Sequence, residues 1–86
     1  AILFIEEYPI HMDALRSALE RGDSAAVERT AHALKGAVAN FGAPAAVEAA
    51  LRIEQCGKNH QLEPVSDILR ALDLVLLALH AELVLL

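Results

Sequence analysis

Apolar residues recur every three or four positions along most of the chain, which is the spacing of one face of an α-helix. Glycine and proline positions divide the pattern into four runs. No segment shows the period-two alternation of a half-buried strand. Four amphipathic runs with short connections predict an all-α fold, an antiparallel up-down four-helix bundle.

The first helix is predicted to begin near Tyr8-Pro9, because proline is tolerated in a first helical turn. It is predicted to end at Gly22, a usual position for the glycine that follows a helix. One face of this run is apolar and carries Met12, Leu15 and Leu19. The short apolar segment from Ile2 to Ile5 precedes it, and we expect this segment to pack over one end of the bundle.

The second helix is predicted to follow at once, with Asp23 or Ser24 as a cap that accepts a hydrogen bond from a free backbone N–H. It continues to about Asn40 or Phe41, and Gly42 ends it. On a helical wheel of about 100° per residue, one stripe of this run is apolar. That predicted core stripe consists of Val27, Ala31, Leu34, Val38 and Phe41.

The third helix is predicted to open at Pro44 and to stop near Gly57, carrying Val47, Leu51 and Glu54. A polar connection leads to Pro64, which opens the fourth helix. The apolar positions of that helix are Val65, Ile68, Leu72, Val75, Leu79 and Leu83. The far end of this run is apolar on more than one face, with Leu74, Leu77, Val84 and Leu85. The N-terminal segment or another chain is expected to cover it.

The length of 86 residues suits one domain over residues 1–86, and the first residue is not methionine, which favours a module of a larger protein. A net charge of −5 argues against a nucleic-acid partner. Charged residues interrupt the apolar stretch 68–86, so we expect no membrane contact. A single cysteine fits a reducing compartment, and we expect a cytoplasmic location.

His32 lies roughly 140° from the centre of the core stripe of the second helix, and should therefore face solvent. Gly36 and Ala39 follow it on the same outer face, where an ordinary solvent face would carry long polar side chains. Small residues let another macromolecule approach the imidazole. The alternative is that Gly36 lets two helices of the bundle touch, and the pattern alone does not separate the two interpretations.

An exposed neutral imidazole is a nucleophile, and most exposed histidines are neutral at pH 7. Lys35 lies three residues on, where its ammonium can stabilise an anion held on the ring. A nucleophile, a cation and open space suit phosphoryl transfer. The four histidines form no i, i+4 pair, so no metal site is expected.

The stretch AHALKGAVANFGA, residues 31–43, closely resembles the signature of histidine-containing phosphotransfer (HPt) domains. The family pattern is Ala-His-x-Leu-Lys-Gly, five variable residues and Gly-Ala. The preceding residues 18–30, and Glu54 followed by a polar loop and a final helix, are similar to the family as well. The resemblance covers almost the whole chain.

The resemblance implies a four-helix bundle that relays a phosphoryl group in two-component signalling. His32 would accept the group from an aspartyl-phosphate on a response regulator receiver domain and pass it on, Lys35 would stabilise the phosphorylated state, and Gly36 would give the receiver room. The receiver would supply Mg²⁺, so the chain would need no cofactor of its own. The resemblance also allows a histidine kinase in the same parent chain, although these residues contain no ATP-binding domain.

Docking is expected on the surface around His32, with Arg29, Ala33, Ala39 and Asn40 as candidate binding residues. Two other functions stay open. The first is a docking module that binds a receiver or kinase without carrying phosphate. The second is a structural oligomerisation bundle, with the apolar end of the fourth helix as its contact.

Overall fold

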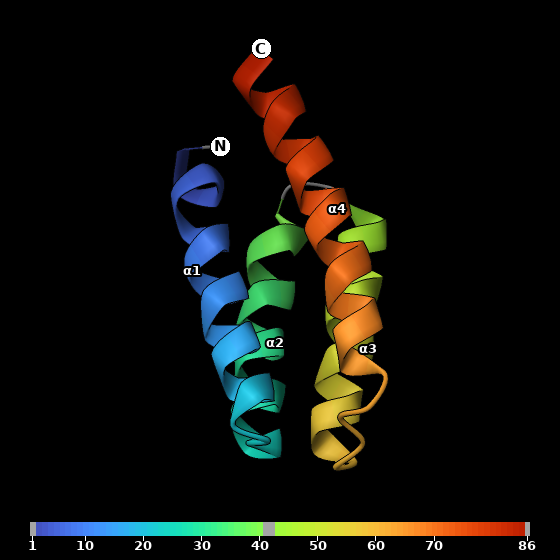
Figure 1. Cartoon of the computed structure of the whole chain (residues 1–86). Coiled ribbons are helices and arrows are strands. Elements are labelled where there is room, and N and C mark those ends of the chain that lie inside the picture. The colour runs from blue at the N-terminus through green and yellow to red at the C-terminus, as the bar shows by residue number, and fades with distance from the viewer. Residues whose placement is uncertain (1, 41–42, 86) are drawn as a thin grey trace.

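The computed structural model consists of four helices, α1 (Ile2–Glu20), α2 (Ser24–Ala39), α3 (Pro44–Lys58) and α4 (Val65–Leu85). It describes the backbone of residues 2–40 and 43–85 and the side chains of residues 9–40, 43–78 and 81. Consecutive helices lie side by side and run in opposite directions (Figure 1). The prediction of an all-α antiparallel four-helix bundle is confirmed.

The first helix begins earlier than the sequence predicted. α1 starts at Ile2 and continues through Pro9, so residues 2–5 form its first turn and not a separate segment. A proline inside a helix lacks one backbone N–H, but the packing of the later turns, from Met12 onward, supports the element as a whole. The side chains of residues 2–5 lie outside those described, so their packing over one end of the bundle stays a prediction.

The turn between α1 and α2 follows the predicted residues. Gly22 has a φ of +66° and ends α1 in a Schellman motif, in which the Gly22 N–H donates to the Leu19 carbonyl and the Asp23 N–H to the Ala18 carbonyl. The Asp23 side chain then caps α2 by accepting a hydrogen bond from the Ala26 N–H at 3.0 Å. The end predicted for α2 at Phe41 and Gly42 lies outside the described residues.

α3 ends at Lys58, close to the predicted end near Gly57, but Gly57 lies inside the last turn and is not the residue that closes the helix. The left-handed residue that ends α3 is His60, with a φ of 57°. The Gln61 N–H donates to the Cys56 carbonyl at 2.9 Å and the His60 N–H to the Gly57 carbonyl at 3.2 Å. This is again a Schellman motif, which glycine usually closes but histidine can adopt.

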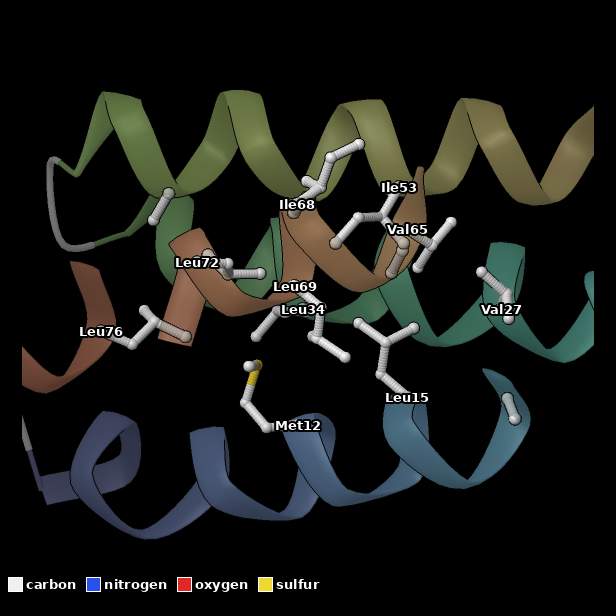
Figure 2. Close-up of a cluster of buried hydrophobic side chains, with 14 of the residues drawn as sticks. Met12, Leu15, Val27, Leu34, Ile53, Val65, Ile68, Leu69, Leu72 and Leu76 are labelled. Atoms are coloured by element: carbon white, nitrogen blue, oxygen red, sulfur yellow. The ribbon is translucent and has the colours of Figure 1, made fainter. Parts of the chain in front are cut away.

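All four helices contribute to one hydrophobic core (Figure 2). Met12 and Leu15 of α1 point toward Leu34 of α2 and Leu69 of α4, and all four side chains are buried. The predicted stripe of α2 is buried at Val27, Ala31, Leu34 and Val38. Leu72 and Leu76 continue the core along α4. Burial of these side chains stabilises the bundle and fixes which face of α2 remains outside.

The buried face of α3 is not the one that its larger apolar residues suggest. The buried residues are small except for one, and they are Ala46, Ala50, Ile53 and Gly57. Leu51 is 38% exposed and Val47 only half-buried. Alanine and glycine on the inner face let the α3 backbone come close to α2, which turns Leu51 outward and brings Glu54 to the boundary between the two helices.

Gly57 lies at a close approach between the backbones of α2 and α3. A Cβ atom built on it would lie 2.7 Å from the backbone nitrogen of Glu28 and 2.9 Å from the carbonyl oxygen of Ser24. These distances are too short for any side chain. From the sequence, a close contact between two helices is an alternative reason for the glycine at position 36. In the structure, it is Gly57 that allows such a contact.

The outer face of α4 carries exposed apolar residues. Leu74 is 65% and Leu77 52% exposed, so the described residues do not cover this part of the helix. Leu79 and Leu83, predicted as core positions, have side chains outside the described set. Among the described residues, no helix is both long and apolar enough to cross a membrane.

Candidate phosphoryl-transfer site

His32 lies in the middle of α2 and faces outward, as its position on the helical wheel predicts. Its side chain is 68% exposed, while its neighbour Ala31 is fully buried. Val27, Ala31, Leu34 and Val38 hold the opposite face of the helix in the core, which fixes the direction of the imidazole. The site is therefore built on a rigid element and presented to solvent.

Glu54 of α3 connects the two chemically active residues of α2. One carboxylate oxygen, Oε2, lies 2.8 Å from Nδ1 of His32. The other oxygen, Oε1, accepts a hydrogen bond from Nζ of Lys35 at 2.7 Å. The carboxylate thus ties the imidazole and the ammonium into one network across the α2–α3 boundary.

The Glu54 contact determines which nitrogen of His32 is free. An ionised carboxylate can only accept hydrogen bonds, so Nδ1 of the ring must carry the proton that is donated to Oε2. In a neutral imidazole the lone pair then lies on Nε2. No hydrogen bond to Nε2 occurs within the described part of the chain. In the neutral form of His32, the nitrogen without a proton is therefore the one that faces solvent.

The same contacts keep Glu54 ionised. The hydrogen bond from Lys35 is the main cause that lowers the pKa of the Glu54 carboxyl below its ordinary value of 4.5, and the hydrogen bond from His32 adds to it. Partial burial of the carboxyl acts in the opposite direction. With the carboxylate charged well below neutral pH, the proton on Nδ1 keeps its acceptor.

Gly36 lies one turn after His32 on the same exposed face. A Cβ built on it would meet no atom within 4 Å. No packing within the described part of the chain therefore requires glycine at this position, in contrast to Gly57. A glycine in a helix interior costs about 1 kcal/mol relative to alanine. The empty space above Gly36 is available to a partner.

A family comparison supports the assignment that these residues suggest. The family model of the Hpt domain matches residues 1–82. The chain belongs to the Hpt domain family. Its members carry out histidine phosphotransfer in two-component phosphorelays and interact with the receiver domains of response regulators. Searches of curated proteins and of solved structures gave no match.

The remaining candidate residues of this Hpt domain surround His32 on α2. Arg29, Ala33, Ala39 and Asn40 are all exposed, as predicted. Arg29 shares a shallow hollow with His32 and Glu54, so the structure brings it to the site. Ala39 belongs to a different hollow farther along α2, and Asn40 is the residue that follows the last turn of the helix.

That second hollow of the Hpt domain is apolar and lies between the end of α2 and the start of α3. Its lining residues are Ala39, Ala43, Pro44, Val47, Glu48 and Leu51. Leu51 lies one turn before Glu54 on α3, and Ala39 lies one turn after Gly36 on α2. The hollow is thus a continuation of the surface that contains His32 and Gly36.

Glu54 is the site residue that sequence reasoning did not assign. From the sequence it is expected on the third helix and is similar to the family, but the pattern gives it no role at the site. A signal was present, because Glu54 directly follows the buried residue Ile53 and lies four residues after Ala50. A carboxylate at the edge of a buried stripe needs a partner. In the described part of the chain, this site included, no group of three or more His, Cys, Asp or Glu residues could hold a metal ion.

Proposed function

We propose that Nε2 of His32 accepts a phosphoryl group from the aspartyl-phosphate of a response regulator receiver domain and passes it to a second receiver. The observation that carries this proposal is the contact between His32 Nδ1 and Glu54, which leaves the lone pair on an exposed Nε2. The position of His32 in the middle of a rigid helix supports it further, since transfer depends on positioning.

The reaction is a displacement at phosphorus. The Nε2 lone pair forms the new N–P bond while the P–O bond to the aspartyl carboxylate breaks, and that carboxylate leaves with the electron pair. The imidazole ring gains positive charge, and its Nδ1 proton stays hydrogen-bonded to Glu54, whose negative charge compensates the ring. Transfer to the next receiver is the same displacement in reverse. Glu54 acts as a positioning residue in both directions.

The receiver docks on the surface of α2 around His32 and Gly36. A receiver brings its phosphoaspartate to His32 only if its backbone and side chains pass over α2. Gly36 leaves room for this approach, because no atom lies within 4 Å of its Cβ position. The apolar hollow that contains Leu51 would accept an apolar side chain of the receiver.

The proposal assigns Mg²⁺ to the receiver, as the family resemblance implies, so that this domain contributes only its own side chains. A histidine kinase in the same parent protein is a second source of the phosphoryl group. Both sources place the reaction in the cytoplasm, which fractionation of the parent protein would test.

The test is phosphoryl transfer from a panel of phosphorylated receiver domains to the wild type and to His32→Gln. His60→Gln is the matched control, because His60 is another exposed histidine of the bundle, beyond the end of α3. We expect label on the wild type and on His60→Gln but not on His32→Gln. The label should be labile in acid and stable in alkali, as a phosphohistidine is.

Other outcomes would support the other functions. Receiver binding without transfer, unchanged in His32→Gln, would replace the relay with a docking module. Neither transfer nor binding, together with self-association that Leu74→Glu abolishes, would favour an oligomerisation bundle, since Leu74 is 65% exposed on α4.

A further inference from the structure

Two cationic side chains lie near His32, and they differ in whether a carboxylate pairs with them. Lys35 is 27% exposed, and its ammonium is hydrogen-bonded to Glu54. Arg29 is exposed, and within the described residues it forms no ion pair. The charge of Lys35 is therefore already neutralised by a carboxylate, whereas that of Arg29 is not.

Arg29 is also on the side of His32 toward which the ring leans. Side chains on an α-helix tilt toward its N-terminus, so the imidazole of His32 lies over the preceding turn. Arg29 is three residues before His32 in that turn, and such pairs are neighbours on a helix surface. Both residues line the same hollow, together with Glu28 and Glu54.

We propose that the Arg29 guanidinium binds the phosphoryl oxygens of phosphorylated His32. This inference rests on the proposed phosphorylation of His32 and assigns Arg29 as the residue that recognises the transferred group. A planar guanidinium offers two parallel N–H donors to a phosphoryl group, which a single ammonium cannot do. Lys35 then serves mainly to hold Glu54, and Arg29 meets the phosphate.

The charges of the site support this division. Lys35 and Arg29 carry two positive charges, and Glu28 and Glu54 carry two negative ones. A phosphoryl group adds about two further negative charges. Because Glu54 already engages Lys35, Arg29 is the only cation lining the hollow that can approach these charges without first breaking an ion pair of the described structure.

The experiment uses small-molecule phosphorylation so that it does not depend on a receiver. Potassium phosphoramidate is used to phosphorylate exposed histidines of the wild type, Arg29→Gln, Arg29→Lys and Arg52→Gln. The ³¹P resonance of phosphorylated His32 is assigned by its absence in His32→Gln and then followed from pH 5 to pH 9. Arg52 is the matched control, an exposed arginine of α3 that lines a different hollow.

A bound guanidinium favours the doubly ionised phosphoryl group, so the wild-type resonance should titrate at lower pH. We expect the midpoint of Arg29→Gln to rise by about half a pH unit, that of Arg29→Lys to rise by less, and that of Arg52→Gln to equal the wild type. Equal midpoints in the wild type and Arg29→Gln would overturn the role of Arg29 and leave the proposed function intact. The absence of any His32 resonance in the wild type would overturn both.

Discussion

Glu54 is the residue on which the geometry of the site depends. Its two oxygens have different partners, the imidazole of His32 at 2.8 Å and the ammonium of Lys35 at 2.7 Å. A carboxylate that is 18% exposed loses part of its hydration and gains two charge-assisted or polar contacts in return. The ring orientation, the position of the proton and the position of Lys35 all follow from this one side chain.

The lowered pKa of Glu54 predicts a pH-dependent stability that the variant Glu54→Gln should lack. A carboxyl with a lowered pKa in the folded state stabilises that state above its ordinary value of 4.5, and the contribution is lost as the pH falls through the folded-state pKa. We expect Glu54→Gln to be less stable than the wild type by about 1 kcal/mol at pH 7. The difference should shrink below pH 4.5. Urea unfolding at several pH values measures it.

Glu48→Gln is the control for this measurement, since Glu48 is an exposed carboxylate of the same helix. It should show little difference from the wild type at any of these pH values. A stability difference between the wild type and Glu54→Gln that stays constant from neutral to acidic pH would contradict the assigned network.

Single residues could be predicted from the sequence where one helix was enough to place them. The outward direction of His32 followed from the wheel of α2 alone, whereas the open space at Gly36 was one of two interpretations that the pattern left open. Glu54 could not be assigned in this way, because its role depends on how α3 is rotated against α2. That rotation is set by Ala46, Ala50 and Gly57, whose small size hides them among larger apolar residues in the sequence.

Among the elements, α2 and α3 are joined most closely, and glycine has opposite roles on the two helices. Gly57 faces backbone atoms of Ser24 and Glu28 at less than 3.0 Å from its Cβ position, whereas Gly36 faces open space. The contact at Gly57 brings the two backbones together and thereby brings Glu54 within reach of His32. The element pair, and not either helix alone, forms the site.

Alanine at the two glycines should therefore change stability in opposite directions. Gly36→Ala should stabilise the domain by about 0.5–1 kcal/mol, because alanine is the better helix former and meets no neighbour. Gly57→Ala should destabilise it by about 1–3 kcal/mol, because the helices must move apart. Urea unfolding of the two variants compares them directly. Stabilisation by both substitutions would show that the α2–α3 contact is looser than described.

The limits of the elements were predictable where a local capping signal existed. Gly22 and Asp23 contain the complete signal for the turn between α1 and α2, and the structure agrees. The end of α3 was predicted to within one residue, but its left-handed residue is His60 and not the glycine that such an end usually carries. The start of α1 was misplaced because Pro9 favours a first turn, while the helix continues through it.

At the scale of the whole molecule, exposed apolar side chains occur in more than one place. Leu51 lies on α3 near the site, and Leu74 and Leu77 lie on α4. Figure 1 shows the start of α1 and the end of α4 at the same end of the bundle. The surface with Leu51 is continuous with His32 and Gly36, whereas that on α4 belongs to another element.

This arrangement predicts that two similar substitutions affect receiver binding differently. Leu51→Glu should weaken receiver binding at least tenfold, because it places a charge in the apolar hollow beside the site. Leu74→Glu should leave receiver binding unchanged. Neither substitution should lower the melting temperature by more than a few degrees, since both side chains are exposed. Titration calorimetry measures the affinities, and equal losses in both variants would argue against docking over the α2–α3 hollow.

Because the space above Gly36 is open, a substitution at this position can change binding of a partner without disturbing the packing of the domain. The first carbon of a side chain there would contact no atom of the chain that the structure describes, and in the proposed docking mode it would face the receiver that reaches His32. A series of substitutions of increasing size, from alanine through serine and valine to glutamine, would measure the space between the two proteins. The side chain at which transfer begins to slow gives the size of that space. The same series would lower the rate of phosphoryl transfer through the relay in graded steps, while the domain stays folded.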